Sequence, residues 1–186
     1  MATASTAAIG TSRDPLPGIL MGGAIAGALD LSFACLNTWL RSGYGPFTVF
    51  KAIASGFLGM RALLGGTGIA FLGLVLHFYI AFAWAAFFAV AAMRWTILIR
   101  RPVLYGVLYG VMIFAVMEWI VLPLSAYPKP VWRLGISPEQ IALGLAAHIL
   151  LIGLPIALSV RYFTGRTTKV LPRAFLSGVF PKSGAS

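Results

Sequence analysis

One stretch of the sequence decides the fold: GIAFLGLVLHFYIAFAWAAFFAVAAM, residues Gly68 to Met93. His77 is the only ionisable side chain in this stretch. An α-helix rises about 1.5 Å per residue, so about 20 apolar residues cross the hydrocarbon core of a bilayer. The stretch is long enough and apolar enough to be predicted as a transmembrane helix.

Three other stretches of the chain have the same character: Pro17–Leu40, Pro102–Ser125 and Ile141–Val160. Just before the last of them, Ser137 can cap a helix, Pro138 suits the first helical position, and Gln140 completes a capping box. Pro155 is predicted to disturb this helix, because its ring leaves a backbone carbonyl group without a donor. The sequence therefore predicts an all-α polytopic membrane protein with four transmembrane helices.

The composition of the 186-residue chain excludes the main alternative classes. Hydrophobic residues make up 60% of the chain and charged residues only 10%, against about a quarter in an average soluble domain. A soluble globule could not bury this much apolar surface, and disordered chains are poor in apolar residues. The net charge of +10 does not indicate a nucleic-acid partner, because the basic residues stand between apolar stretches rather than on one wetted face.

The basic residues predict the orientation in the membrane, since they collect on the cytoplasmic side. Nine lie before the first predicted helix, between the second and third, or after the fourth: Arg13, Arg94, Arg100, Arg101, Arg161, Arg166, Lys169, Arg173 and Lys182. Five lie in the other two connections: Arg41, Lys51, Arg61, Lys129 and Arg133. We therefore expect both termini in the cytoplasm, with an N-terminal segment (1–16), a transmembrane domain (17–160) and a basic tail (161–186).

Two segments are neither predicted spans nor simple loops. Residues 46–64, PFTVFKAIASGFLGMRALL, carry aromatic and aliphatic side chains at helical spacing, interrupted by Lys51 and Arg61. This pattern predicts a helix that lies in the outer interface of the membrane or dips back between the spans. The tail from Arg161 mixes five basic residues with apolar ones, so it is predicted to contact anionic lipid headgroups. The expected partner is therefore the lipid bilayer.

Each predicted transmembrane helix contains one ionisable side chain: Asp30, His77, Glu118 and His148. Such residues are costly in hydrocarbon and normally face the interior of a bundle or a wet cavity. All four lie roughly seven to ten residues from the outer end of their helix, within about two helical turns of a common depth. We therefore expect them to form one polar cluster in the outer half of the membrane.

Small residues accompany these ionisable residues on the same helix faces. Residues three or four apart share a face of a helix, and small residues mark the faces at which membrane helices approach closely. The glycines on these faces are Gly23, Gly27, Gly73, Gly106, Gly110 and Gly144. They are predicted to pack helix against helix, either within one bundle or between the copies of a homo-oligomer.

Two carboxylates and two imidazoles fit several uses. Coupled carboxyl and imidazole groups can take up or pass on protons in the mildly acidic range. The same groups can complete a site for zinc or another divalent metal ion, and the two histidines can serve as the axial ligands of a haem. Alternatively, the polar side chains only lock the helices together.

Signatures of catalysis are absent from the sequence. It contains no HExxH motif, no Gly-rich phosphate loop and no serine nucleophile motif, and Cys35 is the only cysteine. We therefore expect neither an enzyme activity nor a bound metal ion or cofactor. The polar cluster is expected to respond to protons, or to conduct protons or a small solute. A purely structural or assembly role and a haem- or metal-binding bundle are the alternatives.

Four short motifs also carry a resemblance to a known family. They are GLVLHFYIA (73–81), the Arg-Pro pair at 101–102 that leads into Gly106 and Gly110, VLPLS (121–125) and GLAAH (144–148). Together, over about residues 18–163, they resemble the YagU-like proteins, a largely uncharacterised family that is loosely linked to acid resistance.

This resemblance implies a small multi-pass protein of the bacterial inner membrane. It also implies one intramembrane histidine on the helix before the Arg-Pro turn and another on the last helix, which His77 and His148 match. Glu118 departs from the pattern, because a relative is expected to carry His or Asn at this position. The family has no established catalytic residues that could be transferred to this chain.

Overall fold

Four helical spans make up most of the chain. The computed structural model describes residues 14–128 and 137–165, which contain helices and turns but no strand. The first two spans are single helices, α1 (Leu16–Ser42) and α3 (Thr67–Arg94). The other two are built from shorter pieces: α5 (Pro102–Val116), η2 (Met117–Val121) and α6 (Leu122–Leu124) in the third, and α8 (Pro138–Ala147), η3 (His148–Gly153) and α9 (Leu154–Gly165) in the fourth. All four are long and apolar enough to cross a membrane, which confirms the predicted all-α polytopic class.

The ends of these helices lie within five residues of the predicted bounds. The largest difference is at the C-terminal end, where the helix continues to Gly165, so the tail predicted from Arg161 starts as a helix. At the start of α8 the capping box is present: Ser137 Oγ accepts from the Gln140 amide at 3.2 Å, and Gln140 Oε1 accepts from the Ser137 amide at 3.0 Å. Residues 1–13 of the predicted N-terminal segment, 129–136 of the third connection and 166–186 of the tail lie outside the described residues.

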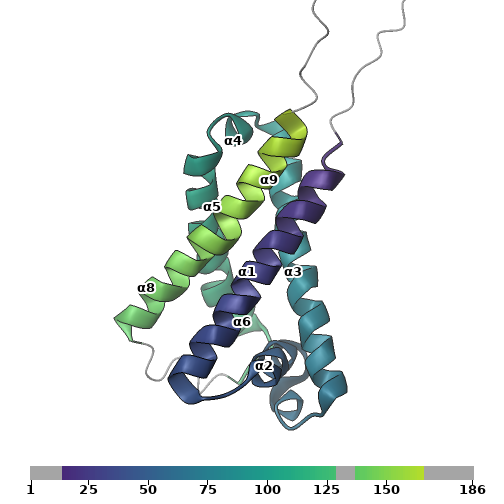
Figure 1. The fold of residues 1–186 in the computed structure, drawn as a ribbon, viewed down its shortest axis with the longest axis vertical. Coiled ribbons are helices and arrows are strands. Elements are labelled where there is room, and N and C mark those ends of the chain that lie inside the picture. The colour runs from purple at the N-terminus through teal and green to yellow at the C-terminus, as the bar shows by residue number, and fades with distance from the viewer. Residues whose placement is uncertain (1–13, 129–136, 166–186) are drawn as a thin grey trace, which may run out of the picture.

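The spans form an antiparallel bundle in which α1 begins and α9 ends at the same end of the molecule (Figure 1). α1 packs against α3 and α9, and α5 packs against α9 and η3. The short helix α4 (Ile97–Arg100) joins α3 to α5 at this end. We call the half of the bundle nearest this end the termini-side half. The opposite half, where α2 (Pro46–Leu58) lies, is the α2-side half.

Helix α2 lies across the bundle rather than along it, since Figure 1 shows it nearly end-on while α1 and α3 run lengthwise. It packs against α3. Their close approach depends on Gly73, because a Cβ atom there would collide with the carbonyl oxygen of Phe50. The 3₁₀ turn η1 (Gly59–Ala62) follows α2, so the helix predicted over residues 46–64 is observed as α2 and η1.

Two of the spans change from α-helix to π-helix shortly before a proline. The π-helical turn η2 ends two residues before Pro123, and η3 ends two residues before Pro155. Proline lacks an N–H donor and its ring clashes with the carbonyl group four residues earlier, and the wider π turn relieves that clash. The disturbance predicted at Pro155 is therefore a π turn. Pro123 is associated with a second π turn, which the sequence analysis did not predict.

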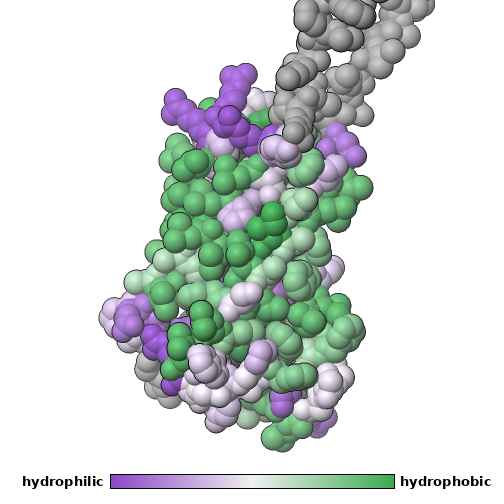
Figure 2. Space-filling view, in the orientation of Figure 1, coloured by the Kyte–Doolittle hydropathy of each residue, from purple (hydrophilic) through white to green (hydrophobic). Residues whose placement is uncertain are grey.

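The tightly packed core lies in the termini-side half, where Phe88, Ile113 and Ile156 are almost completely buried. In the described part of the α2-side half, burial is confined to the contact between α2, η1 and α3, where Ala54, Ala62 and Ala70 are buried. Among the described residues, α1 has no buried residue after Leu31, the third span has none after Phe114, and α8 has none before Ala147. The visible outer surface is apolar between two more polar ends, as expected of a bundle surrounded by lipid (Figure 2).

Candidate functional site: an Asp–His–His group between three helices

Asp30, His77 and His148 come from three different helical elements, α1, α3 and η3. All three side chains are half-buried. The carboxylate of Asp30 lies within electrostatic range of both imidazoles. Opposite charges placed between packed helices attract each other strongly, because little water screens them. We call these three residues the Asp–His–His group.

His77 joins α3 to α1. Its Nε2 atom lies 2.9 Å from the carbonyl oxygen of Gly27. Because a carbonyl oxygen only accepts, this nitrogen carries the hydrogen and donates a hydrogen bond to the carbonyl group. The two helices approach closely at this point, since a Cβ atom on Gly27 would lie 2.9 Å from the ring of Phe78. The glycine therefore exposes the backbone group that positions the histidine.

His148 is held within its own span. Its Nδ1 atom donates to the carbonyl oxygen of Gly144 at 2.8 Å, and its ring meets the ring of Phe114 edge-on, with 5.3 Å between centroids. His148 is also the first residue of the π turn η3. The second ring nitrogen of each histidine, Nδ1 of His77 and Nε2 of His148, makes no hydrogen bond to the rest of the described chain. These two nitrogens are where a neutral imidazole takes up a proton.

Glu118 lies in the other π turn, η2, and is half-buried. Its charge acts on Tyr127, which follows the third span on the α2 side. Burial, and then the negative charge of Glu118, raise the pKa of Tyr127 above its usual value of 10.0. The electrostatic partners of Asp30 are the two histidines. Membership of Glu118 in the polar cluster stays a prediction.

The six predicted packing glycines all lie against a neighbouring element. Their contacts are Gly23 with Phe82, Gly27 with Phe78, Gly73 with Phe50, Gly106 with Leu154, Gly110 with Ile149 and Gly144 with Phe114. The sequence analysis missed Gly153, where a Cβ atom would collide with the backbone of Gly106 and Gly110. Its spacing of four residues from Ile149 and Ala157 on the same face was an available signal.

Tyr109 is a second residue that the sequence analysis missed. Its hydroxyl group is buried between α5 and α3 and donates to the carbonyl oxygen of Trp84 at 2.6 Å. Tyr109 stands directly before Gly110 and three residues after Gly106, on the packing side of α5. A tyrosine beside two packing glycines was the available signal, since a buried phenol needs a hydrogen-bond acceptor.

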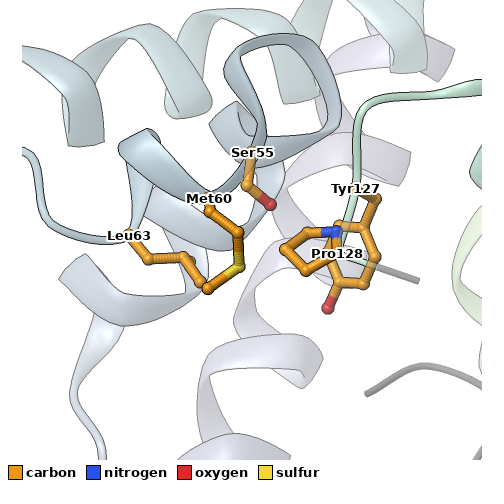
Figure 3. Close-up of a pocket in the computed structure, with 5 residues that line it drawn as sticks. All are labelled: Ser55, Met60, Leu63, Tyr127 and Pro128. Atoms are coloured by element: carbon orange, nitrogen blue, oxygen red, sulfur yellow. The ribbon is translucent and has the colours of Figure 1, made fainter. Parts of the chain in front are cut away.

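One small cavity of about 90 Å³ lies in the α2-side half. Ser55, Met60 and Leu63 line one side of it, and Tyr127 and Pro128 face them (Figure 3). The Ser55 hydroxyl donates to the carbonyl oxygen of Ala52 at 2.6 Å. The cavity is almost wholly apolar and is separate from the Asp–His–His group. Within residues 14–128 and 137–165, no three or more His, Cys, Asp or Glu side chains are grouped so that they could hold a metal ion, and this holds for Asp30, His77 and His148 as well.

The fold and the site define a polytopic α-helical membrane protein with an acidic and two imidazole side chains between its helices. No protein-family model matches the chain, and neither a curated protein nor a solved structure is significantly similar to it. The resemblance to YagU-like proteins therefore stays a prediction that rests on the motifs quoted above.

Proposed function

We propose that this protein is a small multi-pass protein of the bacterial inner membrane that responds to acid by protonation of the Asp–His–His group. One observation carries the proposal: the Asp30 carboxylate lies within electrostatic range of two imidazoles that belong to two other helical elements, without a hydrogen bond or ion pair to either of them among the described residues. Coupled groups of this kind titrate as one unit, and histidine is the side chain that changes charge in the mildly acidic range.

The state of the imidazoles supports this role. In each histidine one nitrogen is already bonded to a backbone carbonyl group, and the other is available for a proton. Protonation there would place an imidazolium ion beside Asp30 and strengthen the attraction between α1 and α3 or between α1 and η3. A change in proton concentration is thereby converted into a change in helix packing.

The packing of the termini-side half favours a response to protons over their conduction. Between the Asp–His–His group and the termini-side end lie apolar side chains such as Phe88, Ile113 and Ile156. The buried hydroxyl groups that the described chain offers there are those of Tyr109 and Thr164, each bonded to a backbone carbonyl. Because the core on this side is apolar, we propose that protons enter and leave from the α2 side.

The α2-side half supports access from that direction. Beyond Leu31 in α1 and before Ala147 in α8, the described residues are exposed or half-buried. The other charged residues on the surrounding elements of this half are Lys51 in α2, Arg61 in η1, Glu118 in η2 and the exposed Arg41–Glu139 pair. We propose that this end faces away from the cytoplasm, as the basic residues predict, so that the group senses the outside pH.

A pH titration of the purified protein in lipid nanodiscs tests the proposal. Hydrogen exchange of the peptides of α1, α3 and η3 is expected to change between about pH 7 and pH 5, where histidine gains its proton. Asp30→Asn keeps the shape of the side chain but removes its charge, so this variant should lose most of the change. Glu139→Gln removes an exposed carboxylate from the same half and serves as the matched control. A wild-type protein without a pH-dependent change, or an Asp30→Asn variant that retains it, would contradict the proposal.

The hydrogen bonds of the histidines also favour a second candidate, a structural or assembly subunit. His77 donates to the Gly27 carbonyl group of α1, which joins two helices without any titration, and His148 donates to Gly144 within its own span. In that case Asp30→Asn should lower the yield of folded protein and leave no pH-linked signal to lose. The nanodisc titration separates the two candidates, because only the first requires a pH-dependent change in the wild-type protein.

A further inference from the structure

Four arginines are exposed at the termini-side end of the bundle: Arg94, Arg100, Arg101 and Arg161. We call them the arginine patch, and a strongly hydrophilic region lies over α4 in Figure 2. The acid that the described chain places at this end is Asp14, whose Oδ1 accepts from the Leu16 amide at 2.9 Å. The ion pair found among the described residues, Arg41–Glu139, lies at the opposite end. The patch therefore has a large positive charge that no described acid neutralises.

The register of α5 against α9 brings part of the patch together. A Cβ atom on Gly106 would lie 3.1 Å from the Cβ of Ala157, so these two residues are at the same level. The helices are antiparallel, so one turn towards the termini-side end leads to Pro102 in α5 and to Arg161 in α9. Arg161 consequently lies at the level of Arg101 and the end of α4, which contacts α9.

The patch is built on a firm support. Leu98 and Ile99 of α4 pack against the buried core, so the arginines that follow them are held in place by the fold. Trp95 at the start of this connection is 64% exposed. Exposed tryptophan side chains at the ends of transmembrane helices lie at the level of the lipid headgroups.

An apolar surface begins directly next to the patch. Along α5, in the direction of the membrane centre, Val103, Leu104 and Leu108 are about half exposed. A ligand that fits both parts has an anionic head and long apolar chains. Guanidinium groups bind phosphate oxygens in pairs of charge-assisted hydrogen bonds, which makes arginine well suited to the head.

We propose that the arginine patch is a binding site for an anionic phospholipid, whose phosphate contacts Arg100, Arg101 and Arg161 and whose chains lie along α5. This site belongs to the folded bundle and is separate from the predicted contact between the basic tail and headgroups. It is also independent of the proposed proton response, because it lies at the other end of the core from the α2-side half.

Native mass spectrometry of the full chain in detergent tests the proposal. The protein is titrated with phosphatidylglycerol and, separately, with phosphatidylcholine that has the same chains. Each basic residue near a membrane surface contributes about fivefold to the binding of anionic lipid, so the triple variant Arg100→Gln/Arg101→Gln/Arg161→Gln should bind phosphatidylglycerol on the order of a hundredfold more weakly. The matched control, Arg41→Gln/Lys51→Gln/Arg61→Gln, removes the same charge from the α2-side end and should bind phosphatidylglycerol like the wild type.

A third arm separates a lipid from a free anion. Inorganic phosphate carries the head chemistry without the chains, so it should not displace bound phosphatidylglycerol at equal concentration. Equal binding of both phospholipids, equal losses in the two triple variants, or displacement by inorganic phosphate would each overturn the proposal. Circular dichroism of both variants checks that the helices are intact, and a single Arg101→Gln variant with about fivefold weaker binding replaces the triple variant if that one does not fold.

Discussion

The two halves of the bundle are held together in different ways. In the termini-side half, helices meet through glycine and alanine at backbone distance, and Gly153 lies directly against Gly106 and Gly110. In the α2-side half, α2 packs on α3 at Gly73, and the exposed Arg41–Glu139 ion pair joins the ends of α1 and α8. The Asp–His–His group lies between the termini-side half and the α2-side half. Steric fit therefore fixes the termini-side half and the α2–α3 contact, while the ends of α1 and α8 are joined by an exposed ion pair.

The largest effect on stability is expected from a change at the glycine contacts of the termini-side half. Gly153→Ala adds a Cβ atom that would collide with the backbone of α5, which cannot move as a flexible side chain can. We expect a loss of about 3 kcal/mol in the free energy of unfolding, at the upper end of typical overpacking effects. Unfolding in mixed detergent, followed by circular dichroism, measures this loss.

The control for this variant is Gly68→Ala near the start of α3. Nothing lies within 4 Å of a Cβ atom at this position. Alanine is a better helix former than glycine, so this change should leave stability unchanged or raise it by up to about 1 kcal/mol. If Gly153→Ala were as stable as Gly68→Ala, the termini-side half would not be held by close backbone contact.

A smaller effect is expected from the one hydroxyl group that links α5 to α3. Tyr109→Phe removes the hydrogen bond to the Trp84 carbonyl oxygen and leaves the ring in place. The expected loss is about 1 kcal/mol, the usual net contribution of a buried hydrogen bond. Tyr79→Phe, at a side chain that is 70% exposed, should be neutral in the same unfolding assay. Equal effects of the two variants would contradict the structural role of Tyr109.

The smallest expected effect sharpens the description of the α2-side half. The pKa of Tyr127 is raised first by burial and then by the charge of Glu118. Glu118→Gln removes the second cause and leaves the first, so the pKa of Tyr127 should fall but remain above 10.0. Absorbance of tyrosinate during an alkaline titration measures the change, with Tyr127→Phe used to assign the signal. An unchanged or higher pKa in Glu118→Gln would show that the two side chains do not interact.

The fold was predictable because long apolar stretches of sequence identify transmembrane helices directly. An apolar stretch as long as Gly68–Met93 is stable only in the hydrocarbon core of a bilayer. The capping box at Ser137 also identified the first residue of α8. The packing faces were predictable for a similar reason, since small residues at helical spacing such as Gly106 and Gly110 indicate contact before any partner is known.

The arrangement of the polar residues was only partly predictable. Depth along each helix predicted that Asp30, His77, Glu118 and His148 lie near one another. Depth carries no information on rotation in a span that contains a π turn, as the spans of Glu118 and His148 do. Glu118 lies inside such a turn, where one extra residue changes the direction in which the following side chains point. The partner of Tyr109 was also hidden, because a backbone carbonyl acceptor leaves no mark in the sequence.

The shared end of α1 and α9 has a consequence for how the protein is made. α1 begins and α9 ends on the same side of the membrane, because the described chain is two helical hairpins, α1 with α3 and α5–α6 with α8–α9. In the orientation proposed above, with this side in the cytoplasm, the connections that pass through the hydrocarbon are those over residues 43–66 and 125–137, and both are short. The chain can then insert as two helical hairpins, each of which carries one connection across the membrane.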